Sequence, residues 1–438
     1  MRRDKQQTII VIAVVVTALT ALLWYILNPG LVPSEGAEAT PVYFADRISL
    51  GHRLVIDRFN QIHRGKIEVV AVDLPFEKFS TNERKELLAR SLRSRSDKLD
   101  VFAVDLIWVR RFARWCEPLD RYIDRDTRER IIPVALRSCI YDTSLVSMPL
   151  YIDIGMMYYR KDIIDRLPDG PQVEEELGRS MSWPDFRHLR DRLGLDGNRY
   201  YVFQADDYEG LVCNYLELVA GLDSGAVGVD HIDLGSEAAR EALRMMVNLV
   251  HADGISPPSV TEFDENLSYS YMLEHDAAFV RGWPNFVENF MKTYPDRAKL
   301  ASIRKAALPH FPSHLPTSVL GGWNLMLSKQ SARKAEAVEF IRFASSMEAE
   351  KIMYEAEGFL PVNREIYRDT AYMRAHPDLA YYYTLLERGF DRPAIVDYTR
   401  ISDILSHYIH RAVRNELTVD EALSQASEMI RSNKVLIK

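Results

Sequence analysis

The chain has 438 residues, of which 47% are hydrophobic and 27% are charged, and its formal net charge at pH 7 is −8. This composition is ordinary for a folded globular protein, so long disordered stretches are not expected. The length is sufficient for two domains. The negative net charge argues against nucleic acid as a partner, because phosphate binding requires a basic face.

The first predicted element is an N-terminal membrane segment. Residues 8–27 contain no charged side chain, and as an α-helix they would span roughly 30 Å, which matches a bilayer core. Arg2, Arg3 and Lys5 precede this run, so we expect residues 1–7 to stay in the cytoplasm and the rest to be exported. The sequence therefore predicts one transmembrane or signal-anchor helix, with the protein in the cell membrane and its globular part outside the cytoplasm.

A cleaved signal peptide is the alternative, and it would release the protein into the periplasm. Ala37-Glu38-Ala39 is similar to a cleavage site, but it lies about ten residues beyond an apolar run that is longer than a usual signal peptide contains. Residues 28–41 include three prolines and two glycines and are predicted to be a tether.

The three cysteines of the chain leave at least one unpaired thiol. Cys213 lies in an apolar helical pattern, which favours a buried thiol. A disulfide between Cys116 and Cys139 is compatible with an oxidising compartment, and the sequence leaves this pairing open.

Strands and helices alternate after the tether, which predicts a parallel sheet with crossover helices. The expected elements are strand 41–44, helix 50–62, strand 67–72, helix 84–93, strand 101–104 and helix 106–115. The buried face of the helix at 50–62 is expected to carry Leu54, Val55, Ile56 and Phe59.

The second half of the chain continues this pattern. An apolar strand region begins at Met148, a helix is expected to start with Ser182 as N-cap, and another strand is expected at 277–280. Helices are predicted at 401–413 and 418–432, the latter opened by a capping box of Thr418 and Glu421.

The catalytic motifs that would indicate an enzyme are missing. The sequence contains no phosphate-binding glycine loop followed by Lys-Ser or Lys-Thr, no Gly-x-Ser-x-Gly and no His-Glu-x-x-His. His407 and His410 share a helix face, which is more typical of a solvated pair than of a metal site. We therefore predict no catalytic residue, no metal and no cofactor, although acids near strand ends keep a glycoside-processing enzyme as a minor alternative.

Aromatic and acidic residues at strand ends indicate carbohydrate binding instead. A sugar presents apolar C–H faces and a rim of hydroxyl groups, so its receptor needs flat aromatic rings and polar side chains. Trp108, Trp283 and Trp323 each follow a predicted strand at a turn, where ligands of open α/β sheets collect. Trp115 and Trp183 lie in amphipathic helices and are assigned to the core.

The segment from Ser318 to Tyr367 is the most informative part of the chain. It combines Gly321-Gly322, which we expect to form a tight turn before Trp323, with two helical patterns and the turn Gly358-Phe-Leu-Pro361. This order resembles the C-terminal half of the extracellular solute-binding proteins of bacterial ABC importers, specifically the sugar-binding group that includes maltose and trehalose receptors.

Further segments carry the same resemblance and imply ligand contacts. Asp100-Val-Phe-Ala-Val-Asp-Leu-Ile-Trp is similar to the family's second strand and loop, and Pro149-Leu-Tyr-Ile-Asp-Ile-Gly to its crossing strand. The stretch Phe203-Gln-Ala-Asp-Asp-Tyr-Glu-Gly and the later Arg-Pro pair resemble the trehalose and maltose branch. The residues implied to contact the ligand are Asp46, Arg47, Asp105, Trp108, Tyr151, Asp153, Glu209, Trp283, Gly322, Trp323 and Arg392.

The resemblance implies a periplasmic-binding-protein type II fold, with two α/β lobes joined by a hinge around a ligand cleft. We expect the first lobe to comprise residues 42–149 and 312–346, and the second to comprise 150–311 and 347–438. The expected function is capture of an oligo- or disaccharide and delivery to the permease subunits of an ABC importer, by a monomer. A membrane-tethered receptor that signals to a sensor kinase is the alternative.

Overall fold

The computed structural model describes residues 39–74, 81–95, 98–290, 293–395 and 397–432, which form a mixed α/β structure built on two sheets. The predicted membrane segment at 8–27 lies outside these residues. Among the helices that are described, none combines the length and the apolar character needed to cross a membrane.

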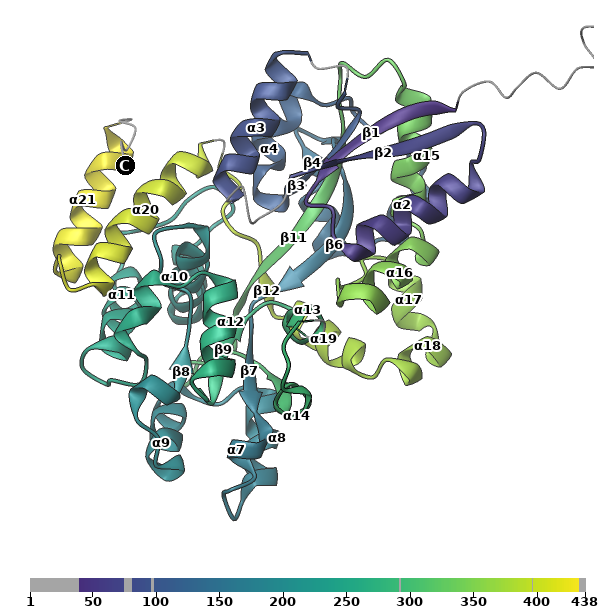
Figure 1. The fold of residues 1–438 in the computed structure, drawn as a ribbon. Helices are drawn as coiled ribbons and strands as arrows, with labels where there is room; N and C mark the ends of the chain where they lie inside the picture. Colours follow the sequence, from purple (N-terminus) through teal and green to yellow (C-terminus); the bar gives the residue numbers. More distant parts are fainter. Residues whose placement is uncertain (1–38, 75–80, 96–97, 291–292, 396, 433–438) are drawn as a thin grey trace, which may run out of the picture.

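The first sheet has six strands, which come from both the N-terminal and the C-terminal parts of the chain (Figure 1). Its order is β12-β11-β3-β1-β2, with β6 paired to β11 as well. β1 runs parallel to β2 and β3, whereas β11 is antiparallel to both β3 and β6. The strands are β1 (Thr40–Asp46), β2 (Ile67–Asp73), β3 (Val101–Asp105), β6 (Met148–Ile154), β11 (Ser318–Leu327) and β12 (Gly389–Phe390).

The second sheet has four strands in the order β10-β7-β9-β8 and lies below the first in Figure 1. Its strands are β7 (Met156–Arg160), β8 (Tyr201–Val202), β9 (Phe279–Gly282) and β10 (Ile303–Ala306). Gly155 alone separates β6 of the first sheet from β7 of the second. A Cβ on this glycine would lie 1.9 Å from Oε1 of Glu217, so the crossing between the sheets depends on the missing side chain.

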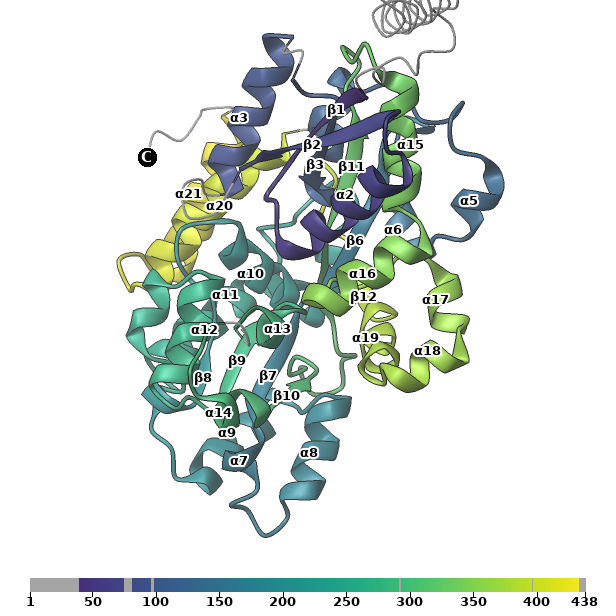
Figure 2. The same ribbon diagram turned by 45° about the vertical axis from the view of Figure 1, so that its right-hand side comes forward.

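Helices cover both sheets. α2 packs on β2, α15 packs on β1 and β11, and α16 lies against α2, as Figure 2 also shows. The helices associated with the first sheet are α2 (Leu50–Ile62), α3 (Thr81–Arg93), α4 (Val109–Phe112), α5 (Arg125–Glu129), α6 (Pro133–Arg137), α15 (Lys334–Ala344), α16 (Met347–Glu357), α17 (Arg364–Arg368), α18 (Thr370–Ala375) and α19 (Asp378–Leu386). Residues 140–145 form a small hairpin of β4 (Ile140–Tyr141) and β5 (Ser144–Leu145).

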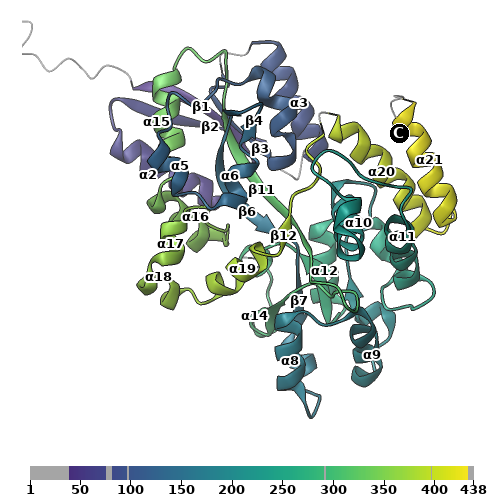
Figure 3. The same cartoon turned by 180° about the vertical axis from the view of Figure 1, so that it is seen from behind.

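The second sheet is surrounded by the remaining helices, and the C-terminal pair packs beside them (Figure 3). α20 contacts α10 and α11, and α21 contacts α11 and α20. These helices are α7 (Lys161–Ile164), α8 (Gly170–Arg179), α9 (Trp183–Leu193), α10 (Glu209–Leu222), α11 (Glu237–Val250), α12 (Glu265–Glu274), α13 (Phe286–Phe290), α14 (Arg297–Ala301), α20 (Tyr398–Val413) and α21 (Val419–Arg431).

Several local predictions are confirmed by cap geometry. α2 has the predicted bounds, Ser182 caps α9, and Thr418 and Glu421 form the predicted capping box of α21. Each cap satisfies backbone N–H groups that a helix leaves unpaired at its first turn, which typically contributes about 1 kcal/mol.

Other local predictions are wrong. The Gly321-Gly322 pair is not a turn, because β11 continues through it from Ser318 to Leu327. The predicted helix at 106–115 is broken into a 3-10 turn, the short helix α4 and a second 3-10 turn. Leu54 is 43% exposed and does not belong to the buried face of α2.

The cysteine question left open by the sequence is answered by the structure. Cys116, Cys139 and Cys213 are all buried and free, so Cys116 and Cys139 do not form a disulfide. Burial raises the pKa of the Cys139 thiol to about 12, which keeps it in the unreactive thiol form.

Candidate ligand-binding cleft

The floor of the candidate cleft is a row of side chains on one face of the first sheet. In the antiparallel pairs around β11, Trp323 lies opposite Asp105 of β3 and opposite Tyr151 of β6. Gly321 lies opposite Asp153. Directly opposed residues of paired strands share a face of the sheet. The register therefore brings Asp105, Tyr151, Asp153 and Trp323, which were predicted from three separate motifs, into one row.

Asp153 has an uncommon environment within this row. Its Oδ1 atom is buried and accepts no hydrogen bond. Burial, with a further contribution from the charge of Asp105, raises the pKa of Asp153 to about 7. A carboxylate that lacks a partner in a buried position is costly for the protein and favours a ligand that donates a hydrogen bond to it.

Gly322 allows β6 and β11 to approach closely beneath this row. Its φ is +131°, and a Cβ there would lie 2.5 Å from the carbonyl oxygen of Tyr151 and 2.9 Å from Cα of Ile152. Both atoms belong to the backbone and cannot move aside. The contribution of Gly322 is thus to shape the floor, since it has no side chain to offer a ligand.

Trp323 is held by residues of the first sheet and its helices. The guanidinium carbon of Arg84 lies 4.5 Å from the centroid of the Trp323 ring, a cation–π arrangement. Trp108 meets Trp323 edge-on, with 6.2 Å between ring centroids. Trp108 itself is only 3% exposed and lies under Lys85, whose Nζ is 5.5 Å from its ring. In this structure Trp108 thus supports Trp323 from the core.

Trp283 approaches the same floor from the second sheet. It follows β9, and a Cβ on Gly321 would lie 3.0 Å from Cζ3 of its ring. The ring carries the guanidinium of Arg281 at 4.2 Å, and its Nε1 donates to Glu265 over 3.2 Å. Arg84 of α3 therefore lies on the ring of Trp323, and Arg281 of β9 lies on the ring of Trp283.

Arg281 also connects the second sheet to β11. Its Nη2 donates to Oε1 of Glu217 over 2.8 Å, and the same oxygen accepts from the backbone N–H of Val319 over 3.2 Å. Both charged side chains are nearly fully buried, at 1% and 6% exposure. This ion pair fixes Arg281, and through it the orientation of Trp283, relative to the first sheet.

Arg392 bridges two acids that come from different parts of the fold. Its Nη2 donates to Asp105 at the end of β3, and its Nη1 donates to Glu209 at the start of α10, both over 2.7 Å. Glu209 also accepts hydrogen bonds from Tyr398 and Ser402 of α20. Burial raises the pKa of Asp105 despite the opposing charge of Arg392. The three residues were predicted as separate ligand contacts, and the structure brings them together as a buried network.

Asp46 is engaged by the protein itself. Its Oδ1 accepts from Arg84 over 2.6 Å and from the backbone N–H of Arg47 over 2.7 Å, and its Oδ2 lies 3.2 Å from Nε2 of His52. Burial would raise the pKa of Asp46, but the His52 and Arg84 interactions outweigh it and the pKa is lowered. Asp46 thus stays ionised and positions Arg84 on Trp323.

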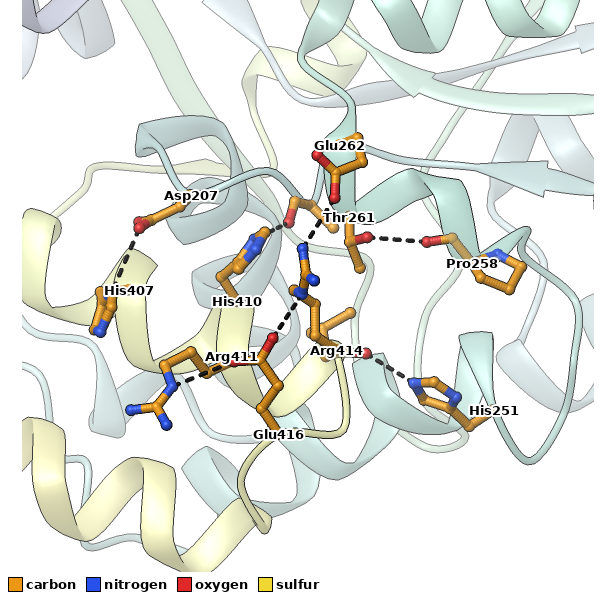
Figure 4. A network of polar contacts seen from close by, with 12 residues as sticks. Asp207, His251, Pro258, Thr261, Glu262, His407, His410, Arg411, Arg414 and Glu416 are labelled. Carbon is orange, nitrogen blue, oxygen red and sulfur yellow. Dashed lines mark hydrogen bonds and ion pairs between the residues drawn. The ribbon is translucent and has the colours of Figure 1, made fainter. Parts of the chain in front are cut away.

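Polar contacts connect α20 to neighbouring segments, including the one between β8 and α10 (Figure 4). His407 lies 3.4 Å from Asp207, whereas Nδ1 of His410 lies 2.9 Å from the carbonyl oxygen of Ala205. The two histidines therefore have separate partners. In the described part of the chain no group of three or more possible metal ligands is found.

Several residues of the cleft were missed by sequence analysis. They are Arg84, Lys85, Glu217, Glu265, Arg281 and Phe359, the last stacked on Tyr151 at 4.2 Å between ring centroids. Arg281 had a usable signal, because it directly precedes Gly282-Trp283 at a strand end. Arg84 had none, since it lies in a helix rich in charged residues.

Comparison with known proteins agrees with this architecture. Residues 49–351 match the family model described as bacterial extracellular solute-binding protein. A probable ABC transporter-binding protein of Deinococcus radiodurans is 25% identical over 351 residues, which cover 78% of this chain and 82% of the relative.

Two solved structures share the fold. The maltose-bound MalE3 of T. maritima superposes with a TM-score of 0.79 at 24% identity, covering 90% of this chain and 100% of that one. A solute-binding protein of an ABC transporter from Thermotoga lettingae, bound with α-D-tagatose, gives a TM-score of 0.76 at 19% identity, covering 90% and 99%. The expected mixed α/β fold of type II periplasmic binding proteins is thereby confirmed.

Proposed function

The chain belongs to the family of bacterial extracellular solute-binding proteins, and from that premise we propose that its cleft captures a carbohydrate and presents it to an ABC importer. Family membership makes the protein a binding protein rather than an enzyme, with its globular part outside the cytoplasm. The naming of the Deinococcus relative as an ABC transporter-binding protein supports the importer as partner.

The observation that carries the proposal is the unpartnered Oδ1 of Asp153 beside two tryptophans. Asp153 lies opposite Gly321, which Trp283 contacts, and Trp323 is two residues further along β11. An aromatic ring covers the apolar face of a pyranose, and a carboxylate accepts hydrogen bonds from its hydroxyl groups. This combination provides both kinds of contact that a sugar requires.

The arginines on the tryptophans refine this proposal. Arg84 and Arg281 each cover one ring face, at 4.5 Å and 4.2 Å from the centroids of Trp323 and Trp283. We expect the sugar to stack on the opposite face of each ring. The guanidinium groups, each held by a buried carboxylate, would keep the indoles in place.

We propose that the two sheets are the cores of two lobes that close on the ligand. The chain passes between them at Gly155, between β10 and β11, and between β12 and α20. A ligand held by Trp323 on one side and Trp283 on the other makes both sets of contacts only in the closed form. Binding therefore shifts the population toward closure, which the importer's membrane subunits would recognise.

A sugar screen by calorimetry and thermal shift tests the function. The full-length protein in detergent should bind a mono- or disaccharide such as maltose, trehalose or tagatose. A ligand at about 100 times its dissociation constant should stabilise the protein by about 2.7 kcal/mol. Binding of amino acids or peptides with no response to any carbohydrate would contradict the proposal.

We further propose that residues 8–27 remain as a membrane anchor. The proposal is supported by the uncharged run, by the positive charges before it and by the distance to Ala37-Glu38-Ala39. Mass spectrometry of the protein extracted from its native membrane should recover peptides of this segment. A mature N-terminus at Thr40 in the soluble periplasmic fraction would refute the anchor.

A further inference from the structure

A second cavity lies between the second sheet and the helices that cover it, away from the proposed sugar cleft. The cavity is narrow. Its empty volume is about 490 Å³, a figure that includes the open solvent at its mouth. Its walls come from α9, α10, α11, β8 and the segment that leads back to β11, and include Trp183, Tyr201, Asn214, Met246 and Phe311. Leu315, which is 84% exposed, belongs to the lining and marks where the cavity opens to the surface.

Two buried polar atoms of this lining have no hydrogen-bond partner. They are Nε1 of Trp183, a donor, and Oδ1 of Asn214, an acceptor. Trp183 is 5% exposed and Asn214 is 6% exposed. The amide of Asn214 is oriented by its Nδ2, which donates to the carbonyl oxygen of Gln204 over 2.6 Å, so Oδ1 is the atom left without a partner. Buried polar groups usually have a hydrogen-bond partner, which can be a protein group, an ordered water or a bound molecule, so these two atoms can serve a ligand that enters the cavity.

The cavity is separated from the cleft by the Glu217–Arg281 ion pair. Glu217 belongs to the cavity lining, and Arg281 lies over Trp283 on the other side of the pair. A molecule in the cavity would therefore not compete for space with a sugar in the cleft.

We propose that this cavity is a second ligand site for a small, flat aromatic compound that both donates and accepts a hydrogen bond. The aromatic and aliphatic walls bury the ring of the ligand, as in most small-molecule pockets. Asn214 Oδ1 accepts from the ligand's donor, and Trp183 Nε1 donates to its acceptor. A purely apolar ligand would leave both atoms unpaired.

Gly221 provides a way to fill the cavity without disturbing the cleft. It belongs to the lining near the end of α10, and a Cβ there would meet Phe311 and Thr317 at 3.6 and 3.7 Å, ordinary contact distances. Gly221→Ala should therefore fold and leave the cavity open. Gly221→Leu extends a longer side chain from the same wall into the cavity.

The test uses benzamide as the probe and ethylbenzene as its apolar counterpart of similar size, with the full-length protein and no sugar present. Calorimetry should detect benzamide binding to the wild type and to Gly221→Ala, and at least tenfold weaker binding to Gly221→Leu. Trp183→Phe retains an aromatic ring without the N–H and should weaken benzamide binding about fivefold, the loss of one neutral hydrogen bond. Ethylbenzene should bind more weakly than benzamide and should not distinguish Trp183→Phe from the wild type.

Three results would overturn the proposal. The first is no benzamide binding to the wild type, and the second is equal affinity of benzamide for the wild type and Gly221→Leu. The third is a crystal soaked with benzamide in which only ordered water lies between Trp183 and Asn214. Sugar affinity measured on the same variants keeps this test separate from that of the cleft, because none of the substituted residues contributes to it.

Discussion

Removing the cation of Arg392 should destabilise the protein more than removing any exposed arginine. The side chain is 2% exposed and donates to Asp105 and Glu209 over 2.7 Å each. In Arg392→Met the two carboxylates, each with 15% of its side chain exposed, would remain with no cation between them. Breaking a buried ion pair by removal of one partner typically costs about 3–5 kcal/mol, so we expect a loss within this range.

Urea unfolding of the full-length protein measures this loss, with Arg414→Met as the matched control. Arg414 also contacts two acids, Glu262 at 3.0 Å and Glu416 at 2.8 Å, but its side chain is 43% exposed. Exposed ion pairs contribute about 0–1 kcal/mol. If Arg392→Met loses no more stability than Arg414→Met, the buried bridge contributes no more to the fold than an exposed ion pair.

A rescue experiment distinguishes charge from packing. The additional change Asp105→Asn removes one of the two uncompensated charges and should restore at least part of the lost stability. Lower pH should act in the same direction. The folded-state pKa of Asp105 is already raised above 3.8, chiefly by burial, and would rise further without the cation. The folded state then binds more protons than the unfolded state, so the variant's stability falls as pH rises above about 4 and recovers below it. No rescue by either route would show that Arg392 acts through its packing alone.

Three further predictions concern the floor of the cleft. The pKa of Asp153 is raised from 3.8 to about 7, so the unliganded wild type should lose stability between pH 4 and 7, whereas Asp153→Asn should show a flatter profile by thermal unfolding. Trp323→Ala should weaken sugar binding at least tenfold, about 1.4 kcal/mol, by calorimetry, and Trp323→Phe should recover part of it; unchanged affinity in the alanine variant would exclude stacking. Gly322→Ala should reduce soluble expression and lower the unfolding temperature sharply, because its Cβ would lie 2.5 Å from the carbonyl oxygen of Tyr151; a stable variant would mean that β6 and β11 can separate.

The sequence predicted those features that depend on short-range periodicity and capping. The apolar spacing of residues 50–62 predicts a helix from local sequence alone, and Ser182 marks a helix start in the same local way. The Gly321-Gly322 pair was misinterpreted because glycine serves both tight turns and the close approach of two strands. Only the tertiary pairing of β6 with β11 shows that here the glycines serve the close approach of strands and not a turn.

The side chains that hold the cleft residues in place could not be predicted from the sequence, for a related reason. Arg84 matters because its guanidinium lies between Asp46 and the ring of Trp323. Nothing within α3 distinguishes this arginine from its charged neighbours. Its two partners lie on the strands β1 and β11, which are distant in sequence. Residues whose role is set by such long-range contacts carry no local pattern, whereas a tryptophan or an acid at a strand end does.

The charge balance of the cleft then identifies the acid that we expect a ligand to use. Asp46 is held by Arg84 and His52, and Asp105 shares Arg392 with Glu209. Each of these three carboxylates already has a cationic or histidine partner from the protein, so a sugar hydroxyl would have to compete with a buried ion pair to reach it. Asp153 instead has a buried oxygen with no partner and a pKa near 7. A sugar hydroxyl that donates to this oxygen would give the buried atom the hydrogen bond that it lacks and would stabilise the ionised carboxylate. Sugar binding should therefore lower the pKa of Asp153 and release a proton near neutral pH. Calorimetry in buffers of different ionisation enthalpy measures that proton, and its absence would assign the hydroxyl contact to another acid.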